Sequence, residues 1–240
     1  VGCIPSKALL HASELFIEKN KFSSMGIEAE NISLNLESMM SYKDNGVNGN
    51  VKGIDFLFNK NKIDAVHGEA KILGSTKIAI ALNDGTKKEI EAKNIVIATG
   101  SVPTSIPGAE ISGDKIISST EALSLDEVPN RLVVVGGGYI GLELGSVWSR
   151  LGSEVTVVEY LNRITPGMDN EVSSAFQKIL AKQGLNFLLN SQVISVTEDG
   201  SNASVVMKNR ESNEEEVIKA DYVLISTGRK PYLENLFSDG

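Results

Sequence analysis

The stretch Arg131-Leu132-Val133-Val134-Val135-Gly136-Gly137-Gly138-Tyr139-Ile140-Gly141-Leu142-Glu143-Leu144-Gly145 decides the fold of the second half of this 240-residue chain. It opens with an apolar, β-branched run that is typical of a strand buried on both faces. A glycine turn follows, and the pattern of residues 142–151 indicates a helix. A second apolar run at 154–159 completes one βαβ unit of roughly 30 residues, so the segment predicts two parallel strands joined by a helix.

The glycine turn carries the pattern G-x-G-x-x-G, formed by Gly136, Gly138 and Gly141. The first glycine allows a tight turn, the second lets the backbone approach a pyrophosphate, and the third permits close packing of the helix, whose N-terminus faces the phosphates. Glu159 follows Gly141 by 18 residues (159 − 141), at the end of the second strand, where its carboxylate can accept the hydroxyls of an adenine ribose. The acid favours NAD over NADP, because it would repel a 2′-phosphate. A glycine turn without a ligand is the alternative.

The remaining elements are predicted from apolar periodicity and turn residues. Helices are expected at 6–22, 36–62 and 169–183. Strands are expected at 63–67, 77–82, 89–91, 94–100, 186–189 and 222–226, with a hairpin turn at 83–85. A small antiparallel insertion is expected at 192–197, 203–208 and 217–219. The predicted fold class is therefore α/β, and Pro103 and Pro107 indicate a domain boundary near residue 101.

Composition narrows the classes of function. The formal net charge of -8 disfavours nucleic acid as a partner. No apolar run approaches the roughly 18 residues of a membrane span, so no membrane is expected. One cysteine and two histidines, His11 and His67, lack the spacing of metal ligands, so no metal is expected and both histidines are expected to be structural. A single thiol fits a reducing compartment better than a secreted protein.

Cys3 is the second candidate for chemistry. Pro5 and the helix that begins near Ser6 place its thiol close to a helix N-terminus, and Lys7 adds a cation within one turn. Both features favour the reactive thiolate. A lone cysteine is more often an inert buried side chain, so from the residues alone both readings stay open. The chain begins at Val1 without a methionine and ends in a turn sequence, and we expect the protein to continue on both sides.

These residues together resemble a known family. The segment Val1-Gly2-Cys3-Ile4-Pro5-Ser6-Lys7 is similar to the redox-active segment of the two-cysteine flavoprotein disulfide reductases, in which a first cysteine lies five positions earlier; here that position would precede residue 1. The resemblance extends to 97–101, to the whole βαβ unit and to 227–231. Pro-Ser-Lys after the cysteine, the helix segment Glu-Leu-Gly-Ser-Val-Trp and the acid at 159 look like the dihydrolipoamide dehydrogenase branch rather than the NADPH-dependent glutathione reductases.

The resemblance implies roles for particular residues. Cys3 would be the thiol nearest the flavin, and Lys7 would lie by the flavin ring and pair with Glu143; a cation there would help to hold a reduced, anionic ring. For Glu143 a solvated helix position is the alternative. FAD would also contact Ala70 and the turn of Thr99, Gly100 and Ser101. NAD would contact the turn and its flanks, with Tyr139 covering the nicotinamide side; the residues are Gly136, Gly137, Gly138, Tyr139, Ile140, Gly141, Leu142, Glu143, Glu159, Val193 and Gly228.

The resemblance also implies an architecture and a reaction. Residues 1–101 would form a partial FAD-binding domain of three-layer type, 102–233 a complete Rossmann-like NAD-binding domain with the antiparallel insertion, and 234–240 the start of a central domain. Electrons would pass from dihydrolipoyl groups, carried by acyltransferase or carrier proteins of 2-oxo-acid dehydrogenase complexes, through the disulfide and FAD to NAD+. The full-length protein would be a homodimer in the bacterial cytoplasm, or in the mitochondrial matrix of a eukaryote. Alternatives are another NAD(P)H-dependent disulfide reductase, such as a mercuric reductase, a non-catalytic NAD-binding module, and a structural interaction domain.

Overall fold

The computed structural model describes residues 2–237. The chain forms two compact units. The first combines Val1–Asn48 with Pro103–Gly228, and the second combines Gly49–Val102 with Arg229–Gly240. The expected division into an FAD-binding part ending at residue 101 and a NAD-binding part after it stays a prediction.

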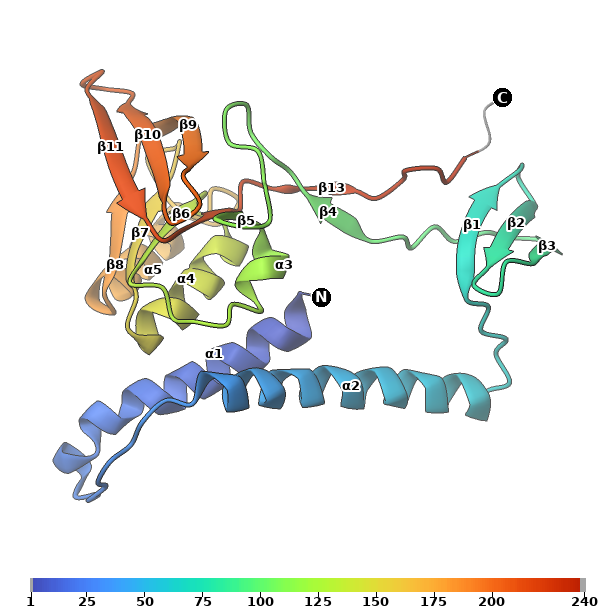
Figure 1. Cartoon of the computed structure of the whole chain (residues 1–240), viewed down its shortest axis with the longest axis horizontal. Helices are drawn as coiled ribbons and strands as arrows, with labels where there is room; N and C mark the ends of the chain where they lie inside the picture. Colours follow the sequence, from blue (N-terminus) through green and yellow to red (C-terminus); the bar gives the residue numbers. More distant parts are fainter. Residues whose placement is uncertain (1, 238–240) are drawn as a thin grey trace. The chain divides into compact units, whose positions relative to one another are not determined.

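A five-stranded parallel sheet forms the centre of the first unit (Figure 1). Its order is β5-β12-β6-β7-β8, and every neighbouring pair is parallel. The strands are β5 (Ile116–Ile117), β6 (Arg131–Val135), β7 (Glu154–Val158), β8 (Leu185–Leu188) and β12 (Tyr222–Ile225). All residues of β6 after Arg131 are buried, because layers cover the sheet on both faces. The predicted βαβ unit is confirmed.

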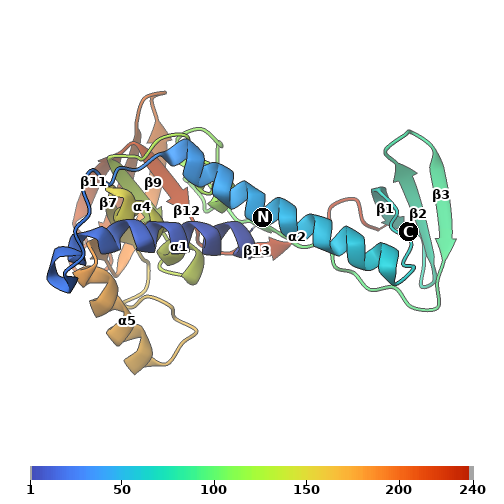
Figure 2. The same cartoon turned by 90° about the horizontal axis from the view of Figure 1, so that it is seen from below.

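Helices cover one face of this sheet. They are α3 (Ser119–Ala122), α4 (Tyr139–Leu151) and α5 (Asn170–Lys182). The Asp169 carboxylate caps α5 by accepting hydrogen bonds from the N–H groups of Glu171 and Val172, which explains where this helix begins. Helix α1 (Cys3–Glu18) packs on the outer side of α4 (Figure 2) and buries Leu9 completely. The first unit thus includes the N-terminal helix.

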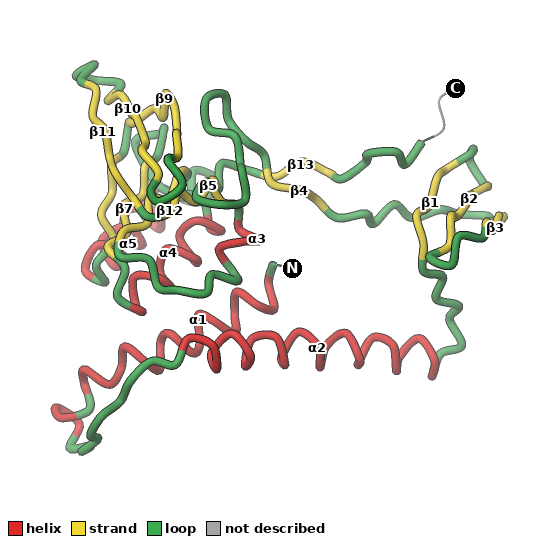
Figure 3. Tube along the Cα trace, viewed as in Figure 1, coloured by secondary structure: helices red, strands yellow, loops and turns green. Residues whose placement is uncertain are grey.

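A three-stranded antiparallel sheet covers the opposite face (Figure 3). It consists of β9 (Ser191–Glu198), β10 (Ala203–Asn209) and β11 (Glu215–Ala220), in the order β11-β10-β9. Its inner residues, Ala203, Val205 and Met207, alternate along β10 and pack against the parallel sheet. The small antiparallel insertion predicted from sequence is confirmed.

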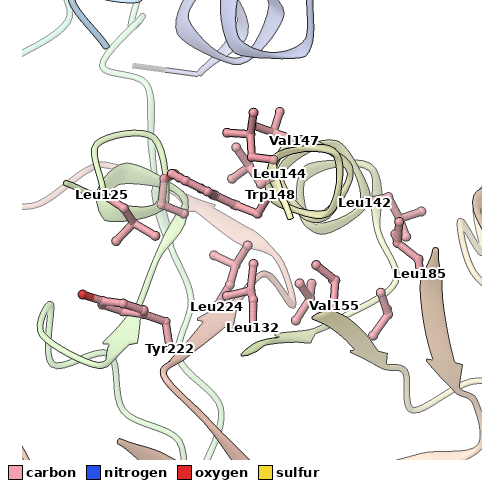
Figure 4. Packing of buried hydrophobic residues seen from close by; sticks show 14 of the residues in the cluster. Leu125, Leu132, Leu142, Leu144, Val147, Trp148, Val155, Leu185, Tyr222 and Leu224 are labelled. Carbon is pink, nitrogen blue, oxygen red and sulfur yellow. The ribbon is translucent and has the colours of Figure 1, made fainter. Parts of the chain in front are cut away.

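The core between α4 and the sheet contains the single tryptophan (Figure 4). Trp148 is 0% exposed, lies over Leu132 and Leu224, and donates its indole N–H to the Ala122 carbonyl at 3.1 Å. The apolar ring therefore fills the core while its polar atom keeps a partner. This packing fixes α4, and with it the glycine turn at the N-terminus of that helix.

The second unit is smaller. The helix α2 (Leu36–Lys60) begins in the first unit and ends in the second, which contains the antiparallel sheet β1 (Gly68–Ile72), β2 (Lys77–Leu82) and β3 (Lys87–Glu91). Short strands β4 (Ser101–Pro103) and β13 (Arg229–Pro231) pair with each other. The predicted turn at 83–85 joins β2 to β3. Two 3-10 turns, η1 (Lys19–Lys21) and η2 (Ser23–Met25), follow α1. None of the helices among residues 2–237 is long and apolar enough to cross a membrane.

Two predicted strands are wrong. Residues 63–67 form no strand, and the pairing with β2 begins at Gly68. Residues 94–100 were expected to be a buried strand, but they are extended without a strand partner, and Val96 is 87% exposed. An apolar, β-branched run forms a strand only where another strand accepts its backbone hydrogen bonds. No strand within the described residues does so here.

Candidate functional site

The glycine turn lies where the order of the parallel sheet reverses. From β6 the chain moves to β7 and β8 on one side, while β12 lies on the other. In open α/β sheets, ligands bind outside the carboxyl ends of strands at such a point. Gly136 has φ 105 and donates its N–H to the Val158 carbonyl at 2.9 Å. A Cβ at Gly136 would lie 2.8 Å from the Ser226 carbonyl oxygen, so the turn requires glycine there.

The next two glycines of the pattern serve different purposes. A Cβ at Gly141 would lie 2.7 Å from both the Gly136 carbonyl oxygen and Val134 Cγ1, so this glycine permits contact between α4 and β6. Gly138 instead faces open space, with nothing within 4 Å of the position of a Cβ. It is the N-cap of α4 and makes no side-chain cap, and Tyr139 is 71% exposed. The N-terminus of α4 therefore presents its N–H groups beside an open backbone, which suits a phosphate.

Glu159 lies directly after β7, beside the glycine turn. Its side chain is 8% exposed, and its two oxygens accept hydrogen bonds from the Gly137 N–H at 2.6 Å and the Leu161 N–H at 2.8 Å. Each carboxylate oxygen has a further lone pair, so these bonds orient the group while leaving it able to accept ribose hydroxyls. The structure thus brings together the acid and the glycine turn that the sequence placed 18 residues apart.

The segment that contains Cys3 belongs to a second cluster, between α1 and α4. Cys3 is the first residue of α1 and is exposed as a free thiol. The Lys7 ammonium donates to Glu143 at 2.6 Å, which forms the ion pair expected from the family resemblance. The Ser6 hydroxyl donates to the other oxygen of Glu143, also at 2.6 Å. Glu143 is therefore a half-buried acceptor held from two sides and not a freely solvated helix residue.

Ser6 was not singled out from the sequence. It is buried, 6% exposed, and lies one residue before Lys7, so both side chains reach the same carboxylate from one turn of α1. A serine next to a lysine gives no signal of its own, because the acceptor lies 137 residues away in sequence. Only the packing of α1 on α4 reveals this contact.

In the second unit, the residues expected to contact FAD lie close together. Ala70 and Thr99 line one cavity of about 800 Å³, together with residues of β1, β2 and β3 and of 232–236. Gly100 has φ 78, and its carbonyl accepts a hydrogen bond from the Tyr232 N–H at 3.0 Å. The Ser101 hydroxyl accepts a hydrogen bond from Arg229 Nε at 2.8 Å. A concave region with a mostly apolar lining can accept an adenine ring.

The remaining residues expected to contact NAD differ in how far they are exposed. Leu142 is 1% exposed in the core, so only its backbone is available to a ligand, and Ile140 is half-buried. Val193 is half-buried on β9 against the second core. Gly228 has φ 151, and nothing lies within 4 Å of the position of a Cβ. Two residues before it, the Ser226 hydroxyl donates to the carbonyls of Val135 and Gly136. Ser226 thereby ties the segment before Gly228 to the glycine turn.

A parallel sheet with a glycine turn at its switch point and a buried acid at the end of the next strand is typical of Rossmann-like, nucleotide-binding proteins. Comparison with known proteins identifies the family. Residues 1–240 match the family described as pyridine nucleotide-disulphide oxidoreductase, and the chain belongs to it. The family is one of oxidoreductases, and its cofactors are FAD and NAD(H). The resemblance seen in the motifs is confirmed.

Proteins of similar sequence and structure support the assignment to this family. "Dihydrolipoyl dehydrogenase 3" of Pseudomonas putida is 50% identical over 238 residues, which are 98% of this chain and 51% of that protein. "Dihydrolipoyl dehydrogenase, mitochondrial" of Dictyostelium discoideum is 51% identical over 239 residues, 98% of this chain and 49% of that protein. The crystal structure of LpdA from Mycobacterium tuberculosis shares the fold, with a TM-score of 0.86 at 24% identity over 98% of this chain and 50% of that one. The chain spans about half the length of the curated relatives it matches.

Proposed function

We propose that this chain is the NAD(H)-binding part, together with the redox-active segment, of a dihydrolipoyl dehydrogenase. The observation that carries the proposal is the open backbone at Gly138 next to the buried, doubly hydrogen-bonded carboxylate of Glu159. The first feature suits a pyrophosphate and the second an adenine ribose, as in the dinucleotide-binding βαβ unit. The names of the relatives support the substrate class.

The preference for NAD over NADP rests on charge. In the proposed binding mode, the Glu159 carboxylate would accept the 2′-hydroxyl of the adenine ribose, and a 2′-phosphate would meet its negative charge. Because the carboxylate is buried against two backbone N–H groups, it cannot turn away into solvent without losing both bonds. We therefore propose that NADH binds at least tenfold more tightly than NADPH, which is roughly 1.4 kcal/mol.

In the whole protein, a dihydrolipoyl dithiol would be oxidised to a disulfide, releasing two electrons and two protons. NAD+ would accept both electrons and one proton as hydride, and the other proton would enter water. FAD, when bound, supplies the redox step between thiols and nicotinamide. Cys3 would be the thiol nearest the flavin, Ser6 and Lys7 would hold Glu143, and Ala70 with 99–101 would bind the FAD adenine and pyrophosphate. Residues 1–101, 102–233 and 234–240 would belong to the FAD-binding, NAD-binding and central domains.

We also propose the setting that the relatives suggest. The dihydrolipoyl groups would be carried by acyltransferase or carrier proteins of 2-oxo-acid dehydrogenase complexes, and the whole protein would be a homodimer. Its compartment would be a bacterial cytoplasm or, in a eukaryote, the mitochondrial matrix. Another NAD(P)H-dependent disulfide reductase remains the second candidate, since Cys3, Pro5 and the glycine turn belong to the wider family.

The test is isothermal titration calorimetry, in which the purified 240-residue chain is titrated separately with NADH and with NADPH. We expect NADH to bind, NADPH to bind at least tenfold more weakly, and Glu159→Ala to remove the difference between them. Glu154→Ala is the matched control, because Glu154 is an exposed acid at the opposite end of the same strand. If the two nucleotides bound equally to the unsubstituted chain, or if neither bound, the proposal would be refuted. NADH binding without retained FAD or diaphorase activity would define this chain as a binding module.

A further inference from the structure

An arginine from the antiparallel sheet reaches the segment that presents Glu159. Arg210 lies in the turn between β10 and β11 and is 50 residues away from Tyr160 in sequence. Its guanidinium stacks over the Tyr160 ring with 3.9 Å between Cζ and the ring centroid. The same side chain donates from Nη1 to the Tyr160 carbonyl at 3.1 Å. One side chain therefore holds both the ring and the backbone of the residue that follows Glu159.

The backbone on either side of Tyr160 is tied to the same sheet. The Asn190 N–H donates to the Leu161 carbonyl at 2.9 Å, and the Ser191 N–H donates to the Glu159 carbonyl at 2.9 Å. Arg210 closes this arrangement, because its own N–H donates to the Asn190 carbonyl at 2.7 Å. The turn that follows β7 is thus held by Asn190 and Ser191, at the start of β9, and by Arg210, which follows β10.

The clamp bears on the carboxylate of Glu159. One of its oxygens accepts from the Leu161 N–H, so the orientation of the acid depends on where the Tyr160–Leu161 peptide lies. Tyr160 itself is 49% exposed and has little packing of its own to hold it. A site that must present an acceptor to a sugar loses affinity when its supporting residues loosen by a fraction of an ångström.

We propose that Arg210 is a positioning residue for nucleotide binding, which acts through Tyr160 to hold Glu159 in the orientation that accepts the adenine ribose. This inference rests on the proposed function. It assigns to the antiparallel insertion a part in the nucleotide site beyond covering the parallel sheet. Arg210 need not touch the nucleotide, because its contacts are with Tyr160 and Asn190.

A general electrostatic effect is the competing explanation, since any cation near the site would attract an anionic nucleotide. Two variants separate the effects. Arg210→Lys keeps the charge but loses the planar group that stacks and donates in a fixed geometry. Lys219→Ala removes a positive charge from β11 of the same sheet without touching Tyr160, and serves as the matched control.

The experiment is calorimetric titration of the 240-residue chain with NADH at constant ionic strength. Arg210→Ala should raise the Kd about two- to fivefold, the range expected for an exposed cation–π contact. Arg210→Lys should show part of this loss, and Lys219→Ala none. In a Glu159→Gln background, titrated over a wider concentration range, Arg210→Ala should change the Kd by a factor of about one, because the group it positions has been altered.

A second variant approaches the contact from the other side. Tyr160→Leu removes the ring but keeps the backbone carbonyl that Arg210 also contacts, so it should weaken NADH binding by no more than Arg210→Ala does, and the double variant should lose no more than Arg210→Ala alone. The emission of Trp148 reports that the first unit remains folded in each protein. An unchanged Kd in Arg210→Ala, or an equal loss with and without the Glu159→Gln change, would overturn the inference. No NADH binding by the unsubstituted chain would instead overturn the proposed function on which the inference rests.

Discussion

Replacing two glycines of the same turn by alanine should affect two different properties. Gly141→Ala should lower the stability of the first unit, and Gly138→Ala should lower its affinity for NADH. In Gly141→Ala, the added Cβ would lie 2.7 Å from both the Gly136 carbonyl oxygen and Val134 Cγ1, well inside van der Waals contact. Overpacking of this kind costs about 1–3 kcal/mol, while replacing a helical glycine by alanine returns up to about 1 kcal/mol. We expect a net loss of about 1 kcal/mol in the free energy of unfolding of the first unit, the middle of the resulting range of about 0–2 kcal/mol.

Gly138→Ala should leave that stability almost unchanged. The new Cβ meets nothing within 4 Å, and the backbone φ of -78 suits any residue. Alanine is a poorer N-cap than glycine by about 0.5 kcal/mol, which is the whole expected cost. The methyl group would instead occupy the space through which a pyrophosphate approaches the backbone, so the affinity for NADH should fall at least about tenfold.

The buried Trp148 allows stability and binding to be followed in the same samples. It is the single tryptophan and belongs to the first unit, so its emission in a urea titration reports the unfolding of that unit alone. Binding is measured by titration with NADH on the folded proteins. The reasoning fails if Gly141→Ala is as stable as the unsubstituted chain, or if Gly138→Ala binds NADH with full affinity.

Three further predictions concern stability. Ser6→Ala should destabilise the first unit by about 0.5–1.5 kcal/mol, because one oxygen of Glu143 loses its partner; chemical denaturation checks this, and an unchanged midpoint would contradict it. Burial acts to raise the pKa of Glu121, but hydrogen bonds from the hydroxyl and N–H of Ser118 outweigh it and lower that pKa. The contribution of Glu121 to the free energy of unfolding is therefore present above its unfolded pKa of 4.5 and is lost as the pH falls through its folded-state pKa. When the free energy of unfolding is measured against pH, Glu121→Gln should reduce its fall on the acid side. Burial raises the pKa of Tyr222 above 10.0 in the folded protein. The contribution of Tyr222 to the free energy of unfolding is therefore complete below pH 10.0 and is lost as the pH rises through its folded-state pKa. Thermal melts of Tyr222→Phe should lack this loss of stability at alkaline pH.

Local sequence determined the central βαβ unit and the acid that follows it. The four apolar residues of β6 that follow Arg131 suit a strand covered on both faces, and Gly136 and Gly141 each meet a separate steric demand at the turn. Glu159 comes at the end of β7, so its distance from the turn follows from the length of one helix and one strand. The antiparallel insertion was predictable for the same reason, because alternation along β10 is a local property.

Tertiary structure decided the features that depend on neighbours. The run at 94–100 has the composition of a buried strand, yet strand formation requires a second chain segment to accept its hydrogen bonds, and composition cannot tell whether one is present. The contacts of Ser6 with Glu143 and of Arg210 with Tyr160 join residues 137 and 50 positions apart. No local pattern encodes such pairs, because side chains that meet across packed layers are selected by the fold as a whole.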